Sequence, residues 1–286
     1  MGHRKRVALV TGASSGLGRA IANDLQDGGF RVYGTSRKAG ESNPHGNFEL
    51  ITMDVDQDAS VEAAIGALVD REGRLDVVVS NAGMGIAGAL EDTSSDEALA
   101  QFQTNFFGNH RVCRAALPHL RARARAHLVV VGSIAGRIGV PFQGMYSATK
   151  FALEGYCEAL RMELRGSSVR VALIEPGDFA TGFTAARRQT TGSGNGSAYR
   201  AAFEAALAII EKDEMNGADP TLVSKAVWQI VESDRPALRN LVGPLSQTAI
   251  ARAKPLFPAA AFEALIADHY KVPGQPALKS DQSPSS

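Results

Sequence analysis

The chain has 286 residues, enough for one large α/β domain or two small ones with a well-buried core. Its 30 basic and 30 acidic residues balance, so charge gives no reason to expect nucleic acid or an anionic membrane as a partner. The 2 cysteines and 6 histidines form no pattern with disulfide or metal-ligand spacing, and we expect no metal site.

The start of the chain is basic, but the apolar run that follows covers only Val7 to Val10. Such a run is too short for a signal-peptide core or a membrane span. We expect a soluble, cytoplasmic protein without a membrane-spanning segment.

Short apolar runs then alternate with amphipathic helical patterns. The runs predict seven strands, at Arg6–Val10, Arg31–Thr35, Phe48–Met53, Leu75–Ser80, Leu128–Val131, Val169–Ile174 and Ala237–Val242. Helices are predicted at about Leu17–Leu25, Val61–Val69, Ser95–Arg121 with an interruption near Pro118, Gly144–Arg165 and Pro220–Ser233. Strands that are apolar throughout are buried on both faces, which favours a parallel sheet between two helical layers. The predicted fold is α/β, a Rossmann-type, doubly wound, seven-stranded parallel sheet.

The whole pattern predicts one domain over residues 1–243. Within it, residues 179–215 would form a lid over the substrate, with a flexible, glycine-rich loop from Thr190 to Ser197. Residues 244–272 would add a helical extension to the same domain, in two pieces near Ser246–Lys254 and Ala259–Tyr270. The Pro/Ser/Lys-rich tail at 273–286 is expected to be disordered.

A glycine-rich loop joins the first strand to the first helix. It runs from Thr11 to Gly18, with glycines at positions 12, 16 and 18. Glycines allow a tight turn and a close approach of the backbone, and a helix N-terminus offers free N–H groups to a pyrophosphate. The loop therefore predicts nucleotide binding.

The second strand ends in Ser36-Arg37-Lys38, without the acidic residue that an NAD site places against the ribose diol. Arg37 can pair with a 2′-phosphate and stack on adenine, with Ser36 or Lys38 in support. NADP(H) is the preferred cofactor and NAD(H) remains possible, since Arg37 could also be a solvated loop residue.

Tyr146 and Lys150 stand four residues apart at the start of a predicted helix, and therefore on one face. A nearby ammonium favours the phenolate and lowers the pKa of the phenol toward the working range, which would let the pair move a proton to or from a substrate oxygen. Alone, the pair could equally be a surface tyrosine and a solvated lysine.

Together these clusters resemble the short-chain dehydrogenases/reductases over Arg6 to about Val242. The matching motifs, in family order, are Thr11–Gly18, Asp54-Val55, Ser80-Asn81-Ala82-Gly83, Asn105, Gly132-Ser133, Tyr146 with Lys150, and Pro176-Gly177 with Thr181. Ser80 departs from the pattern, because the family commonly has a second asparagine there.

The resemblance implies a catalytic role for four residues. Tyr146 would be the general acid in reduction and the base in oxidation, and Lys150 would lower its pKa and bind the nicotinamide ribose. Ser133 would hold the substrate oxygen by a hydrogen bond. Asn105 would anchor a water that links Lys150 to solvent.

The resemblance also implies the cofactor contacts. Asp54 would accept from the adenine amino group, residues 81–83 would line the adenosine ribose, and Thr181 would bind the carboxamide or a phosphate. The full implied set is Gly12, Ser14, Ser15, Gly16, Leu17, Gly18, Ser36, Arg37, Asp54, Val55, Asn81, Ala82, Gly83, Tyr146, Lys150, Pro176, Gly177 and Thr181.

The substrate is expected to be a lipophilic carbonyl compound or secondary alcohol, because apolar residues follow the later strands. The pocket candidates are Ile138, Phe142, Phe179 and Phe183. The extension past Gly243 is more similar to the steroid- and retinol-type members, or to general carbonyl reductases, than to the compact acyl-carrier-protein ketoreductases.

Three other functions stay open. They are a catalytically silent NADP(H)-binding regulator or scaffold, an NAD-dependent alcohol dehydrogenase, and a sugar-nucleotide epimerase, which usually needs a larger carboxyl-terminal domain. By resemblance, a homodimer or homotetramer would form through the Ser95–Arg121 and Tyr146–Arg165 helices.

Overall fold

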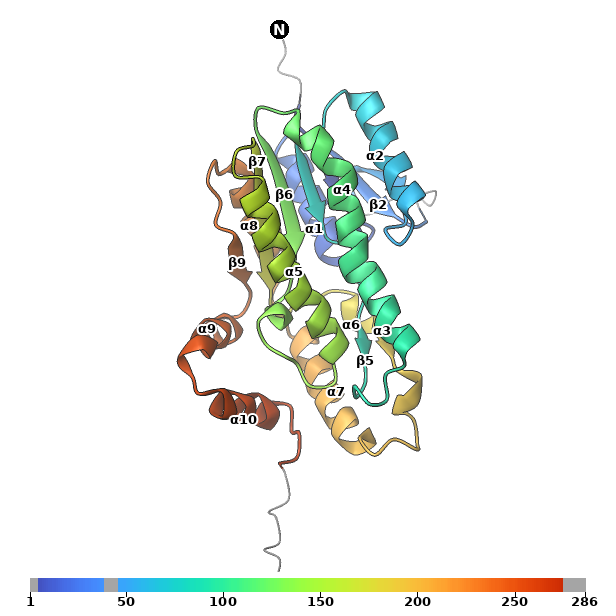
Figure 1. Cartoon of the computed structure of the whole chain (residues 1–286), viewed down its shortest axis with the longest axis vertical. Helices are drawn as coiled ribbons and strands as arrows, with labels where there is room; N and C mark the ends of the chain where they lie inside the picture. Colours follow the sequence, from blue (N-terminus) through green and yellow to red (C-terminus); the bar gives the residue numbers. More distant parts are fainter. Residues whose placement is uncertain (1–4, 39–45, 275–286) are drawn as a thin grey trace, which may run out of the picture.

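The computed structural model of the chain describes residues 5–38 and 46–274 (Figure 1). At its centre lies a seven-stranded sheet in the order β3-β2-β1-β4-β6-β7-β9, and every neighbouring pair is parallel. The strands are β1 (Val7–Val10), β2 (Arg31–Ser36), β3 (Glu49–Thr52), β4 (Val77–Ser80), β6 (Ala126–Val131), β7 (Val169–Pro176) and β9 (Arg239–Val242). The predicted doubly wound sheet is confirmed, and the predicted disordered tail lies, from residue 275 on, outside the described residues.

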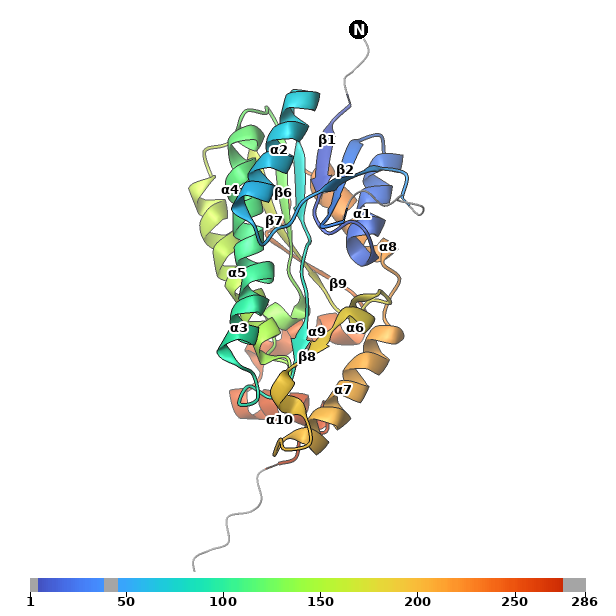
Figure 2. The same ribbon diagram turned by 90° about the vertical axis from the view of Figure 1, so that its right-hand side faces the viewer.

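Helices cover both faces of the sheet (Figures 1 and 2). The helices α2 (Asp58–Glu72), α4 (Gly108–Arg121) and α5 (Gly144–Glu163) pack on one face, and α1 (Gly16–Asp27) and α8 (Thr221–Glu232) on the other. Alternate residues of one strand serve the two cores: Leu9 belongs to the first cluster and Val10 to the second. This double burial explains why the strands are apolar throughout.

The predicted helical interruption near Pro118 is wrong. The break is a π-helical turn at Gln103–Phe107, between α3 (Ser95–Phe102) and α4. Pro118 lies inside α4 on its exposed side, where water can solvate the carbonyl group that loses its partner. Single-turn π segments frequently mark functional sites, and this one contains Asn105.

The segment predicted to form a lid consists of α6 (Phe183–Ala186), β8 (Arg188–Gln189), a 3-10 turn (Thr191–Ser193) and α7 (Arg200–Met215). β8 pairs in parallel with β5 (Ile86–Ala87), which follows β4; strands of two residues have no readable sequence pattern. Two hydrogen bonds join the predicted flexible loop 190–197 to neighbouring segments. Thr191 donates its N–H to Glu97 at 2.8 Å, and the Ser197 hydroxyl donates to Asp92 at 2.6 Å.

The carboxyl-terminal extension forms α9 (Leu245–Ala253), a 3-10 turn (Lys254–Leu256) and α10 (Ala259–His269). It packs against the turn that follows β6: Ile138 from that loop, Ala251 from α9 and Phe262 from α10 form one buried cluster. The extension thus reaches the carboxyl ends of the strands (Figure 2). No helix in the described part of the chain has the length and apolar character needed to cross a bilayer.

Candidate active site

A cavity of about 1370 Å³ lies at the carboxyl ends of the strands. Its walls are the loops after β1, β2, β4, β6 and β7, together with residues of α7, α9 and α10. It lies beside β1, where the chain order of the sheet reverses, which is the usual ligand position in such folds. Since single small-molecule pockets measure about 300–1,000 Å³, the cavity has room for two ligands side by side.

The glycine loop fits a pyrophosphate. Gly12 and Gly16 have φ angles of 65° and 54°, in the left-handed region that other residues rarely adopt. A Cβ atom on Gly18 would lie 2.4 Å from the Gly12 carbonyl oxygen, so α1 can approach the loop closely only with glycine there. Ser15, at the N-cap of α1, makes no side-chain cap, so its hydroxyl leaves the first N–H groups of the helix free for an anion. Gly18 lies behind the cavity and does not line it.

Asn81 holds the glycine loop against the loop after β4. Its amide nitrogen donates to the carbonyl oxygens of Thr11 at 2.9 Å and Gly12 at 3.3 Å. The Thr11 hydroxyl in turn accepts the backbone N–H groups of Asn81 and Ala82, both at 2.9 Å. Thr11 was not among the predicted site residues, although a polar side chain directly after a buried strand was a usable signal.

The other end of the cavity reaches the end of β2. The exposed side chains of Arg37 and Lys38 line this end of the cavity. Asp54 and Val55, which follow β3, line it too. The Asp54 carboxylate accepts the backbone N–H of Asp56 at 3.0 Å. Within residues 5–38 and 46–274 neither cation forms an ion pair, so two positive charges line this end of the cavity.

Tyr146 and Lys150 both line the cavity from the first turns of α5. The Lys150 ammonium donates to the Val131 carbonyl oxygen at 2.9 Å and lies 5.6 Å from the centre of the Tyr146 ring. Burial lowers the pKa of Lys150 to about 8 and raises the pKa of Tyr146 to about 12, against the stabilising effect of the Ser133 hydroxyl on the phenolate. The pKa of Tyr146 is thus raised in the protein alone, not lowered as expected. Loss of hydration has a larger effect on the phenol than the neighbouring ammonium of Lys150, which is itself hydrogen-bonded to a carbonyl oxygen.

Ser133 follows β6 by two residues and faces Tyr146 across the cavity. Its hydroxyl caps the 3-10 turn Ile134–Gly136, accepting the N–H of Ala135 at 3.1 Å, and lies 3.5 Å from the Pro176 carbonyl oxygen. The long contact to Pro176 is weak, so the hydroxyl hydrogen can turn to another acceptor in the cavity.

Asn105 is buried and does not line the cavity. From the π turn, its amide nitrogen donates to the Met84 carbonyl at 3.0 Å and the Thr149 hydroxyl at 3.2 Å, and its oxygen accepts the Met84 N–H at 2.8 Å. The side chain therefore fastens the loop after β4 to α5, beside Lys150.

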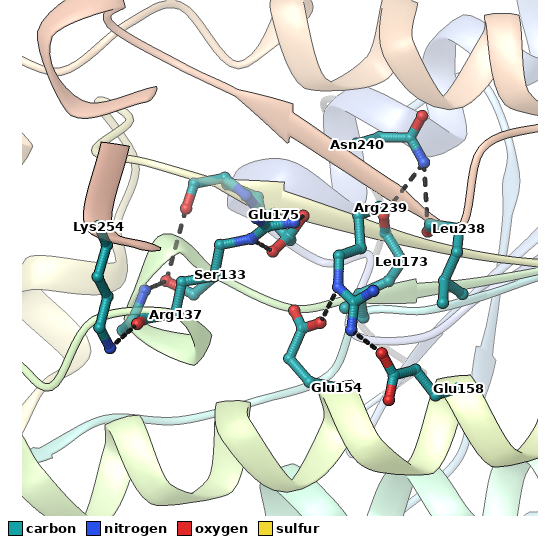
Figure 3. A network of polar contacts seen from close by, with 12 residues as sticks. Ser133, Arg137, Glu154, Glu158, Leu173, Glu175, Leu238, Arg239, Asn240 and Lys254 are labelled. Carbon is teal, nitrogen blue, oxygen red and sulfur yellow. Dashed lines mark hydrogen bonds and ion pairs between the residues drawn. The ribbon is translucent and has the colours of Figure 1, made fainter. Parts of the chain in front are cut away.

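A partly buried network of ion pairs and hydrogen bonds lies beside the Ser133 loop (Figure 3). Arg137, in that loop, pairs with Glu175, a fully buried carboxylate of β7 directly before Pro176. Lys254 of the extension donates to the Arg137 carbonyl oxygen at 2.5 Å. Nearby, Glu154 of α5 pairs with Arg239 at 2.6 Å. Burial, and then the hydrogen bond with Glu175, raise the pKa of Glu154 to about 7.

Three of the four predicted pocket residues, Ile138, Phe179 and Phe183, line the cavity. Phe183 lies 5.8 Å from Tyr146, ring centre to ring centre. Phe142 is not among the lining residues: its ring packs against Phe203 of α7 at 5.7 Å, in a small core with Ala87 and Leu207.

Sequence reasoning missed the distant part of the wall, which comes from segments brought in only by tertiary packing. Its members are Asp178, Ile210, Asp213, Glu214, Gln247, Ile250, Leu265, Ile266, His269 and Tyr270. Among the described residues, no group of three or more His, Cys, Asp and Glu side chains could hold a metal ion.

The fold and the glycine loop at the strand ends define an α/β protein of the dinucleotide-binding class. A family model described as short chain dehydrogenase matches residues 6–192, and the chain belongs to this family of oxidoreductases. The predicted family and enzyme class are confirmed, and the fold is one that binds NAD(P)(H).

Two curated relatives and two solved structures illustrate the similarity. The chain is 43% identical over 253 residues to 3-ketodihydrosphingosine reductase of Bacteroides thetaiotaomicron, covering 88% of this chain and 93% of the relative. It is 37% identical over 193 residues to human 17-beta-hydroxysteroid dehydrogenase type 1, covering 63% and 58%.

The structure of a short-chain dehydrogenase from Streptomyces avermitilis superposes with a TM-score of 0.78 at 29% identity, covering 95% of this chain and 98% of the other. That of an alcohol dehydrogenase from Thermococcus sibiricus, complexed with 5-hydroxy-NADP, gives a TM-score of 0.68 at 25% identity, covering 84% and 97%.

Proposed function

We propose that the protein is an NADP(H)-dependent oxidoreductase that transfers a hydride between the nicotinamide and a carbonyl or secondary alcohol of a lipophilic small molecule. The observation that carries this proposal is the convergence of Tyr146, Ser133 and Lys150 on the cavity that also contains the glycine loop. When bound, the dinucleotide supplies or accepts the hydride.

The protein supplies position and a proton. In reduction, the hydroxyls of Tyr146 and Ser133 donate hydrogen bonds to the carbonyl oxygen, where negative charge develops. Tyr146 then gives its proton to that oxygen, and in oxidation it takes the proton back. A phenol whose pKa is raised by burial is fully protonated at neutral pH, which suits the role of acid.

Lys150 stands beside the phenol to offset the phenolate that this step leaves. Both amide hydrogens of Asn105 are already used within the protein, so a relay water beside Lys150 would have to be held by backbone groups. We therefore propose Asn105 as a residue that positions α5.

The preference for NADP(H) rests on Arg37 and Lys38, which line the adenosine end of the cavity without a carboxylate among residues 36–38. Bidentate arginine–phosphate contacts are strong and geometrically specific. Arg37 would hold the 2′-phosphate, and Ser36 would support it.

The lipophilic substrate rests on the apolar side chains around Tyr146. Phe179, Phe183, Ile138 and Ile250 line the cavity, and the Phe183 ring lies beside Tyr146. The Bacteroides relative is named for reduction of 3-ketodihydrosphingosine and the human relative for a hydroxysteroid, and both names support a lipophilic carbonyl or alcohol as the substrate here.

A panel of lipophilic ketones and alcohols, assayed with NADPH, NADH and their oxidised forms by dinucleotide absorbance, tests the proposal. We expect turnover with NADPH or NADP⁺. Tight binding of NADPH without turnover of any compound would favour a silent regulator or scaffold, and faster turnover with NADH would favour an NAD-dependent alcohol dehydrogenase.

A further inference from the structure

One wall of the cavity carries a carboxylate that the chemistry above does not use. Asp178 follows Gly177 at the end of β7, on the same cavity as Tyr146. Gln247 of α9 holds it in place: the amide nitrogen donates to the carboxylate at 2.5 Å, and the amide oxygen accepts the Asp178 N–H at 2.9 Å. The side chain is therefore fixed, by a residue of the carboxyl-terminal extension.

The charges around Asp178 do not balance. Two more carboxylates line the same wall from α7, and each has its own partner. Glu214 pairs with the buried Arg187 and accepts the Thr184 hydroxyl at 2.6 Å, and Asp213 faces the His269 ring at 3.2 Å. Among residues 5–38 and 46–274, no lysine, arginine or histidine forms an ion pair with Asp178.

This imbalance has an electrostatic cost. Burial raises the pKa of Asp178 to about 6, and the charges of Glu214 and Asp213 raise it further, against Gln247 and Arg187. At neutral pH the Asp178 carboxyl is therefore mostly ionised. The amide of Gln247 can donate a hydrogen bond to this carboxylate but cannot neutralise its charge. The charge on Asp178 is also close enough to act on the phenol of Tyr146. A cation placed between the two would stabilise the carboxylate and lie next to the reacting carbonyl.

We propose that Asp178, fixed by Gln247, binds a cationic amino group of the substrate, so that the preferred substrates are lipophilic amino ketones or amino alcohols. The inference rests on the proposed function and narrows its substrate class. The apolar part of the cavity would take the hydrocarbon chain, and the carboxylate would take the ammonium by a charge-assisted hydrogen bond.

The test compares two ketones of equal chain length, one with an amino group on the carbon beside the carbonyl and one without. A hydrogen bond to a charged group contributes about 1.5–3 kcal/mol, so the wild type should favour the amino ketone in kcat/KM by about 10- to 100-fold. In Asp178→Asn this preference should fall to within about threefold of unity, chiefly through a higher KM. Turnover of the neutral ketone should change much less than that of the amino ketone, because the lost charge reaches it only through the phenol of Tyr146, and affinity for NADPH should be unchanged.

Asp213→Asn is the matched control, because it removes a carboxylate from the same wall that already faces His269. It should keep the preference for the amino ketone. The pH profile is a second readout: KM for the amino ketone should fall as the pH rises through about 6, while KM for the neutral ketone stays flat.

The possible failures are distinguishable. If the wild type reduces both ketones equally well, the inference is wrong while the proposed function stands. Equal losses for both ketones in Asp178→Asn, or weaker NADPH binding, would assign the carboxylate to the fold or the cofactor. If the wild type reduces neither ketone, the proposed function fails and this inference fails with it.

Discussion

Tyr146 illustrates that the spacing of a sequence motif predicts which residues lie together but not their pKa values. The four-residue spacing correctly predicted that Tyr146 and Lys150 share a face. It could not predict that Lys150 would be buried and Tyr146 largely shielded from water, with the pKa of the phenol raised to about 12 and that of the lysine lowered to about 8. Burial depends on the lid and on the loop after β6, which are distant in sequence.

Phe142 shows that position after a predicted strand does not determine where a side chain lies. Its place after the fifth predicted strand made it a reasonable pocket residue, yet its φ of 60° turns the chain so that the ring packs under the lid. A non-glycine residue with positive φ cannot be foreseen from the residue type.

Arg37 gives a prediction at this scale. Arg37→Asp should raise KM for NADPH by about 10- to 100-fold, because a charge-assisted contact is replaced by repulsion of the 2′-phosphate. KM for NADH should stay within about threefold. Steady-state kinetics with both cofactors checks this; equal effects on the two would show that Arg37 does not contact the 2′-phosphate.

At the scale of elements, the strands were predictable because each is a short apolar run that ends in a turn signal. The break in the long helix was not, since a π turn needs no glycine or proline. Glu175 was also overlooked: a carboxylate inside an apolar strand indicates a buried ion pair, and here it joins the loops that carry Ser133 and Pro176.

The network around Glu175 makes a prediction about stability and pH. The pKa of Glu154 is raised to about 7 from a usual 4.5, so the folded state binds this proton more tightly than the unfolded chain does. The contribution is therefore fully favourable below about pH 4.5 and is lost as the pH rises toward 7. Glu154→Gln, which keeps the neutral form, should reduce the fall in Tm between pH 5 and 8.

Glu158→Gln is the control for that experiment. Glu158 contacts the same Arg239 but is half-exposed, at 49% of its side chain. Its Tm profile should follow the wild type. If Glu154→Gln shows the same fall in Tm as the wild type, the proton bound by Glu154 does not contribute to stability.

At the scale of the whole molecule, the sheet and its two helical layers follow from the alternation of strands and helices. The cavity does not, because about a third of the residues that line it come from the predicted lid segment and the extension. Only the packing of α9 and α10 against the Ser133 loop brings Gln247 and Tyr270 to the site.

The expected homodimer or homotetramer is a proposal that exposed apolar side chains of α5 support. Phe151 and Met162 are three turns apart on one face of α5 and are 42% and 70% exposed. Met162→Glu should shift the mass in light scattering after gel filtration to a smaller species. Leu245→Glu, a change at a site 79% exposed on the extension, should not. A monomeric wild type would contradict the proposal.

The account depends most on Tyr146 as the proton donor. In Tyr146→Phe, turnover of the best ketone with NADPH should fall at least about 100-fold, the usual scale for a general acid, while the Kd for NADPH stays within about threefold. Stopped-flow turnover and fluorescence titration of NADPH, on the same preparation, measure both quantities. Retained turnover with normal NADPH binding would show that the phenol of Tyr146 does not donate the proton.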